Sequence, residues 1–111
     1  MRRDEELLVD VLRYAKLAVR RASNRNEDEL SADEDFQSLL IHPLLVIGEA
    51  VKKLSADFWQ EPSEIPWEKI ARMRDRLIHV YDRVDWKIVW ETVTSDLPKL
   101  IEVLEKKGVS E

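Results

Sequence analysis

Met73-Arg74-Asp75-Arg76-Leu77-Ile78-His79-Val80-Tyr81 is the segment that carries most information about this chain. On the 3.6-residue period of an α-helix, one apolar stripe passes through it, formed by Ile70, Met73, Leu77 and Val80. A polar stripe at positions i, i+3, i+4 and i+7 is formed by Arg72, Asp75, Arg76 and His79. The segment therefore predicts an amphipathic helix that packs one face on a core and presents a polar site on another.

The spacing of two residues in this helix suggests a shared site. Arg74 and His79 are five residues apart, which separates them by about 140° around a straight helix. They do not easily converge on one small group from a single regular helix. Either the helix loosens near His79, or two copies of the chain meet across a two-fold axis, and we favour the dimer. Asp75, four residues before His79, is predicted to orient the imidazole ring.

The flanking sequence predicts further helices at residues 4–22 and 32–55 and from residue 85 onward, with a short helical turn at 56–62. The motif helix itself is expected at 67–80. The apolar faces of the first two helices are Leu8, Val11, Leu12, Ala15, Ala18 and Ala22, and Phe36, Leu39, Leu40, Leu44, Ile47, Val51 and Leu54. Four main helices joined by short links predict an all-α fold, an antiparallel four-helix bundle with an additional short helix. Residues 1–111 are expected to form a single domain.

Local signals predict where these helices begin and bend. The acidic stretch from Glu27 is expected to be a loop that leads into a capping box between Ser31 and Glu34. Pro43 is expected to kink the second helix, because it removes a backbone donor. Asp85 is expected to cap the last helix, which Pro98 should bend without ending.

Gly48 is the only glycine inside a predicted helix, where it costs about 1 kcal/mol relative to alanine. A close approach by another helix would explain its presence. Glu49, next to it, either faces the site around Arg74 or forms a surface salt bridge.

Charge is unevenly distributed along an acidic chain of net charge −5. Residues 27–35 contain six acids and no base, whereas residues 69–87 contain six bases and three acids. Phosphate binding depends on local cations. A basic region on an acidic protein can therefore bind RNA at one place, here through Arg72, Arg76 and Arg83, and repel it elsewhere. The alternative is a solvated helix face with interspersed charges.

Composition argues against several other classes of protein. The chain has no cysteine and two histidines, which leaves no plausible zinc cluster. It has no apolar run of membrane length and no apolar segment typical of a signal peptide. A cytoplasmic protein that needs neither a metal nor a cofactor and has no membrane partner is expected.

Residues 74–81 fit the pattern Arg-x4-His-x-Tyr. Short segments before and after this pattern give further matches, and these occur in the expected order along the chain. The flanking matches are Ile47-Gly48-Glu49-Ala50, Ile65-Pro66-Trp67, Val84-Asp85, Val89-Trp90 and Asp96-Leu97-Pro98. Together they make the chain resemble the HepT-like branch of the HEPN superfamily, from about Glu5 to Leu104.

This resemblance implies a small helical protein that dimerises and acts as the ribonuclease toxin of a toxin–antitoxin system. It implies a partner antitoxin, the minimal nucleotidyltransferase MntA, which attaches AMP to the motif tyrosine, here Tyr81. In the enzyme that we expect, His79 acts as general acid or base and Arg74 stabilises charge on the phosphate. The alternative is a non-catalytic helical module that binds a nucleotide or docks on a nucleotidyltransferase, with Arg74 and His79 as phosphate ligands.

Overall fold

The computed structural model describes residues 3–79 and 83–111, and the regular elements among these residues are all helical. They are α1 (Asp4–Ala22), α2 (Glu27–Ala32), α3 (Glu34–Lys52), α4 (Ala56–Gln60), α5 (Trp67–His79), α6 (Trp86–Glu91), the π-helical segment η2 (Thr92–Asp96) and α7 (Leu97–Lys106). The predicted all-α fold is therefore confirmed. Val80 and Tyr81 of the motif lie outside the described residues.

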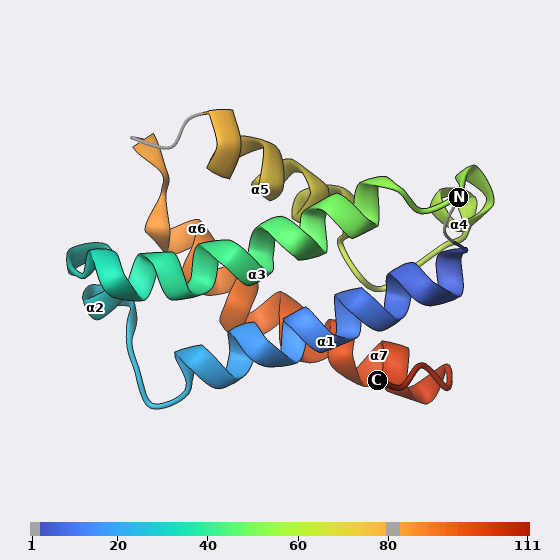
Figure 1. Ribbon diagram of the computed structural model, residues 1–111, viewed down its shortest axis with the longest axis horizontal. Helices are drawn as coiled ribbons and strands as arrows, with labels where there is room; N and C mark the ends of the chain where they lie inside the picture. The colour runs from blue at the N-terminus through green and yellow to red at the C-terminus, as the bar shows by residue number, and fades with distance from the viewer. Residues whose placement is uncertain (1–2, 80–82) are drawn as a thin grey trace.

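The long helices run in alternating directions, as expected for an antiparallel bundle (Figure 1). Helix α3 packs against α1 on one side and against α5 on the other, and α1 also packs against α7. No helix in residues 3–79 and 83–111 combines the length and apolar character needed to cross a bilayer. The motif helix α5 is thus held mainly by α3.

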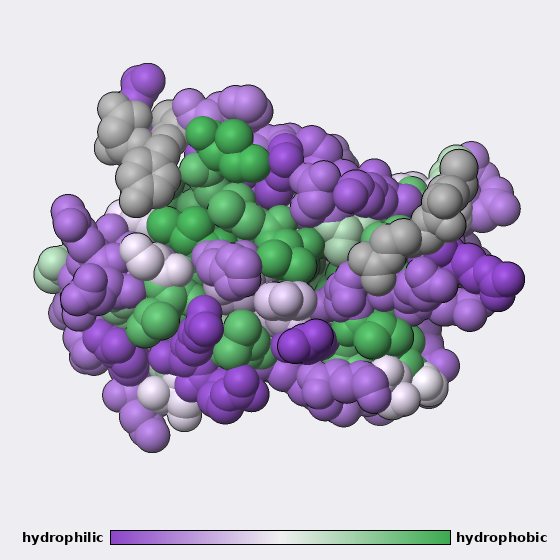
Figure 2. Space-filling model, in the orientation of Figure 1, coloured by the Kyte–Doolittle hydropathy of each residue, from purple (hydrophilic) through white to green (hydrophobic). Residues whose placement is uncertain are grey.

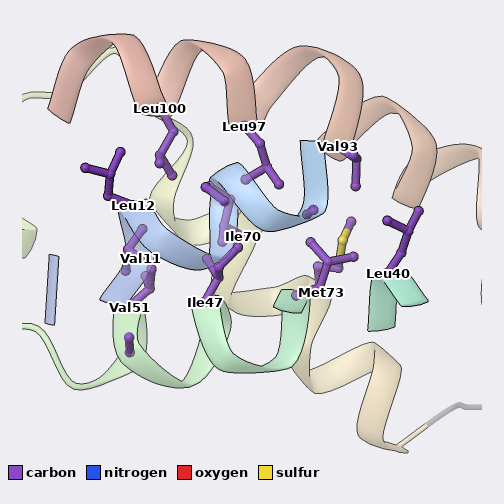
Figure 3. Close-up of a cluster of buried hydrophobic side chains, with 14 of the residues drawn as sticks. Val11, Leu12, Leu40, Ile47, Val51, Ile70, Met73, Val93, Leu97 and Leu100 are labelled. Atoms are coloured by element: carbon purple, nitrogen blue, oxygen red, sulfur yellow. The ribbon is translucent and has the colours of Figure 1, made fainter. Parts of the chain in front are cut away.

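One hydrophobic core joins these helices (Figure 3). Its fully buried side chains include Val11, Leu12, Phe36, Leu40, Ile47, Val51, Leu97 and Leu100. Two predicted core positions are wrong: Leu8 is only partly buried, and Leu39 is 41% exposed. On α1 it is Leu7 that is buried, because it lies one turn before Val11 on the same stripe.

The segment from Glu27 was expected to be a loop, but it forms the short helix α2. The reason is a capping box one turn earlier than the predicted one: Asn26 accepts from the backbone N–H of Glu29, whose side chain accepts from the backbone N–H of Asn26. Asp33 then adopts an extended conformation and caps α3 through its carboxylate. Helix α3 consequently begins at Glu34 and ends at Lys52, not at residues 32 and 55.

The last helical stretch begins as predicted, because the Asp85 carboxylate accepts from the backbone N–H groups of Lys87 and Ile88. It is not a uniform α-helix. Residues Thr92–Asp96 form a π-helical segment, in which the N–H of Leu97 donates to the carbonyl of Thr92. Pro98 lies in the first turn of α7 and has no backbone N–H, so the regular hydrogen-bond ladder is interrupted between η2 and α7.

The predicted close approach at Gly48 is confirmed, and the neighbouring helix is α5. A Cβ atom on Gly48 would overlap the Cβ of Arg74 and lie 2.8 Å from its Cγ. The stem of Arg74 therefore rests on the bare backbone of α3. This contact brings α5 closer to α3 than any larger residue at position 48 would allow.

We expect Gly48→Ala to destabilise the fold. Forcing a methyl group against Arg74 should cost about 1–3 kcal/mol, which outweighs the gain of about 1 kcal/mol in helix propensity. Chemical denaturation measures the change, and Ser38→Ala, at an exposed position of the same helix, is the matched control. An unchanged or increased free energy of unfolding for Gly48→Ala would show that the two helices can separate without cost.

Candidate active site around Arg74 and His79

Helix α5 places Arg74 against α3 because its apolar stripe points into the core. Ile70, Met73 and Leu77 are all at most 6% exposed. Arg74 lies beside this stripe with its side chain 23% exposed, and its guanidinium reaches the Glu49 carboxylate at 2.8 Å. Both expectations for Glu49 are seen: it faces Arg74, and with its side chain 47% exposed it also forms a surface salt bridge with Lys53.

The Arg74 guanidinium is part of a chain of charges that bridges α3 and α5. Its second nitrogen donates to the Asp75 carboxylate at 3.1 Å, and the same oxygen of Asp75 accepts from the Lys52 ammonium at 2.8 Å. Glu49 also lies 3.6 Å from the Lys53 ammonium. Two carboxylates thus fix the direction of the guanidinium, and two lysines partly offset their negative charge.

The Asp75 carboxylate responds to this environment. The hydrogen bond from Lys52, followed by that from Arg74, lowers the pKa of Asp75 below its ordinary value. A lowered pKa means that the contacts of Asp75 stabilise the fold at neutral pH and lose that effect as the pH falls through the pKa of the folded state. The side chain is 42% exposed, so solvent screens this contribution.

A groove of about 330 Å³ opens beside Arg74 between α1, α3 and α5. Its apolar walls include Leu45, Val46 and Ile78, and its charged rim includes Glu49 and Arg74. Ile78 is 44% exposed. Figure 2 shows hydrophobic surface gathered over α3 and its border with α5 on this side of the molecule, surrounded by hydrophilic residues.

His79 is exposed at the C-terminal end of α5, which stays α-helical from Trp67 to His79. Because the helix does not loosen within the described residues, Arg74 and His79 keep their angular separation. In the described part of the chain, the partners of Asp75 are Lys52 and Arg74, not His79. The predicted orienting role of Asp75 toward His79 therefore stays a prediction.

The three predicted RNA-binding arginines, Arg72, Arg76 and Arg83, are exposed. Arg72 forms an exposed ion pair with Glu68 at 2.9 Å, a kind of contact that contributes little to stability. Tyr81, the predicted site of modification, lies outside the described residues. Among residues 3–79 and 83–111, no three His, Asp or Glu side chains are arranged to hold a metal ion.

Lys52 is a site residue that the sequence analysis missed. It lies three residues after Glu49, so both side chains project from the same side of α3. This spacing was a usable signal once Gly48 marked the face of α3 that meets α5. The pairing with Asp75 depends on how the two helices are aligned along their axes, and the sequence alone does not give that alignment.

Replacing Lys52 with methionine should raise the pKa of Asp75 toward its ordinary value, because the largest cause of its lowering is removed. Carboxyl-detected NMR titration measures this pKa directly. Lys53→Met is the matched control, since Lys53 pairs with Glu49 instead. An Asp75 pKa that is the same in the Lys52 variant and the control would mean that the Lys52–Asp75 contact does not form in solution.

Comparison with known proteins places these residues in a family. The profile described as "Ribonuclease HepT-like" matches residues 11–107. A "Putative RNase" of Caldanaerobacter subterraneus subsp. tengcongensis is 32% identical over 111 residues, which cover 96% of this chain and 99% of the relative. A "Probable ribonuclease HepT" of Thermococcus cleftensis is 43% identical over 79 residues, covering 71% of this chain and 72% of the relative.

A third relative, a "Putative RNase" of Methanocaldococcus jannaschii, is 36% identical over 99 residues, which cover 89% of this chain and 82% of the relative. No solved structure matches the chain. The family profile spans α5 and the elements that hold it, including Gly48, Glu49 and Arg74. The chain belongs to the HepT-like ribonuclease family.

Proposed function

We propose that this protein is a metal-independent endoribonuclease that acts as the toxin of a toxin–antitoxin system. Membership of the HepT-like ribonuclease family supports the reaction class. The observation that carries the proposal is the placement of Arg74, whose guanidinium is held by Glu49 and Asp75 at the edge of an open groove. A fixed cation at an accessible surface suits a group that stabilises phosphate charge in a transition state.

The reaction divides between two residues of the motif. His79 is exposed and takes a proton from a ribose 2′-hydroxyl, whose oxygen then attacks the adjacent phosphorus. The 5′-oxygen of the next nucleotide leaves and takes up a proton, so the products are a 2′,3′-cyclic phosphate and a 5′-hydroxyl. Arg74 stabilises the charge on the phosphorus oxygens, for which its planar fork is suited. The exposed Arg72, Arg76 and Arg83 guide the RNA strand.

The active form is a homodimer. Arg74 and His79 lie on different sides of a regular helix, so a second copy supplies the missing partner around one phosphate. The groove lined by Leu45, Val46 and Ile78 gives that copy an apolar surface next to Arg74 (Figure 2). Large apolar patches with a polar rim are typical of protein interfaces.

The purified protein should cleave RNA in the presence of EDTA, and His79→Ala should reduce the rate by about 10²- to 10⁴-fold because the proton-transfer group is lost. Cleavage is followed on end-labelled RNA, and the cyclic phosphate is identified by its resistance to phosphatase. His42→Ala is the matched control, since His42 is exposed on α3 and packs edge-on against the Tyr14 ring. Binding of RNA without any cleavage by the wild-type protein would instead support a non-catalytic module.

The proposed regulation acts on Tyr81. The partner antitoxin, an MntA-like minimal nucleotidyltransferase, attaches AMP to the phenolic oxygen and releases pyrophosphate from ATP. The added bulk and negative charge next to the motif exclude the substrate phosphate. Tyr81 lies outside the described residues, so this step rests on the motif alone.

A Tyr81→Phe variant should remain toxic when the antitoxin gene is co-expressed, because the acceptor oxygen is absent. Growth of cells that express both genes measures the effect, and mass spectrometry of the wild-type toxin tests for the added AMP. Tyr14→Phe, which removes the other tyrosine hydroxyl of the chain, is the control and should be neutralised normally. Neutralisation of Tyr81→Phe would show that the antitoxin acts by binding without modification.

A further inference from the structure

Two adjoining grooves lie between α5 and α6, on the side of α5 that carries Arg76. One has a volume of about 290 Å³, and the other of about 270 Å³. They share three lining residues, Met73, Arg76 and Ile88. The two hollows therefore form one continuous groove, which we call the α5–α6 groove.

The walls of the α5–α6 groove are largely apolar. Val84, Leu77 and Val89 line its deeper part together with Met73, which is 6% exposed. Ile88, at the edge of the groove, is 37% exposed. The groove is therefore an apolar surface that is open to solvent and lies beside the packed hydrophobic core.

Its rim is cationic. Within residues 3–79 and 83–111, neither Arg76 nor Arg83 has an ion-pair partner. Arg72, at the other end, has only its exposed pair with Glu68. Asp85, the one carboxylate among the described residues that line the groove, uses an oxygen to cap α6. Apolar walls below unpaired guanidinium groups form a surface complementary to a planar ring attached to a phosphate.

Lys69 lines the groove but is not a free cation. Its ammonium lies 2.8 Å from Asp96 and 3.1 Å from Glu91. These contacts tie α5 to η2 and the end of α6. The free positive charge is therefore concentrated near Arg76 and Arg83, toward the end of α5 where His79 lies.

We propose that the α5–α6 groove is a nucleotide subsite that receives the base and phosphate of one RNA nucleotide next to the cleaved bond. The proposal rests on the proposed ribonuclease function and specifies how the substrate strand is held. The base lies on Met73, Val84 and Ile88, and the phosphate is bound by Arg76 and Arg83. His79 follows Arg76 by three residues on the same side of α5, which brings the bound strand to the proton-transfer group.

The chemistry of the groove favours a single unstacked nucleotide over other ligands. Proteins that recognise single-stranded RNA place splayed bases on aromatic side chains or guanidinium planes and bind the backbone with cations. In the α5–α6 groove, the aliphatic side chains of Val84 and Ile88 and the thioether of Met73 would supply the apolar surface for the base. Methionine is flexible and adapts to ring systems of different shape, so Met73 can contact either a purine or a pyrimidine. The larger hollow, of about 290 Å³, is just below the usual range of small-molecule pockets, which starts at about 300 Å³, so it is of a suitable size for one ring system.

The chain contains two methionines, Met1 and Met73, so a methyl-labelled sample carries one reporter inside the groove. The Met73 methyl NMR signal should shift on titration with AMP or UMP and saturate. Ribose 5-phosphate, which lacks the base, should bind about tenfold more weakly, because burial of the base against the apolar walls is lost. Equal affinities for ribose 5-phosphate and AMP, or no response of Met73 to either nucleotide, would overturn the proposal.

Two substitutions at exposed positions separate the base from the phosphate contacts. Ile88→Asn should lower the affinity for AMP to that for ribose 5-phosphate and leave the affinity for ribose 5-phosphate unchanged. Arg76→Gln should lower the affinity for both ligands. Leu39→Asn replaces an aliphatic residue of similar exposure on α3 and should change neither. Unchanged AMP binding in Ile88→Asn, with the circular dichroism spectrum preserved, would contradict the assignment of the base.

The RNA cleavage assay and the Met73 NMR titration, applied to the same protein sample, distinguish failure of this subsite from failure of the proposed function. His79→Ala should lose cleavage and keep the Met73 response to AMP. If the Met73 signal of the wild-type protein responds to AMP but the protein does not cleave RNA, the nucleotide subsite is supported and the nuclease function is contradicted. Cleavage without a Met73 response retains the nuclease and rejects the subsite, and a response to acidic peptides in place of nucleotides would assign the groove to a protein partner.

Discussion

The contact between the backbone of α3 at Gly48 and the side-chain stem of Arg74 governs the arrangement of the rest of the site. Because position 48 has no side chain, α5 lies close enough to α3 for Arg74 to reach Glu49 and for Asp75 to reach Lys52. Each ion pair is partly exposed and contributes modestly to stability. Together they fix the direction of the Arg74 guanidinium group, which in the proposed mechanism matters for catalysis more than for folding.

The same contact explains why one subunit is insufficient in the proposed mechanism. The apolar stripe of α5 must face the core, so Arg74 points toward α3 and His79 emerges at the exposed end of the helix. The two groups cannot both turn toward one phosphate unless α5 leaves the core. In the proposed dimer, a second copy on the groove beside Arg74 avoids that cost, because it would bring its own His79 to the site and cover the exposed Ile78. The α5–α6 groove lies on another side of α5 from this proposed interface.

Features with short-range causes were predictable from the sequence. The helical class, the bounds of α1, the cap at Asp85 and the close approach at Gly48 follow from periodicity, capping residues and the cost of glycine in a helix. Helix α2 was missed because several capping residues lie close together: Asn26 caps α2, and Asp33, not Ser31, caps α3.

The partners in the site were harder to predict, because they depend on contacts between helices. Lys52 and Asp75 are 23 residues apart, and their pairing follows from the alignment of α3 with α5. Likewise, the sequence shows Ile88 only as one more apolar residue of the last helix, and it becomes a groove wall because the fold places α6 opposite α5. Residue types and spacing indicated the chemistry, whereas the direction of each side chain required the fold.

Mixing two inactive variants tests most directly whether the site is shared between subunits. Arg74→Ala and His79→Ala proteins are each expected to be inactive, and after subunit exchange a mixed dimer retains one Arg74 and one His79 at the common site. The account predicts that the mixture regains ribonuclease activity in proportion to the mixed dimers counted by native mass spectrometry. A mixture that stays as inactive as the separate variants, with mixed dimers present, would contradict it.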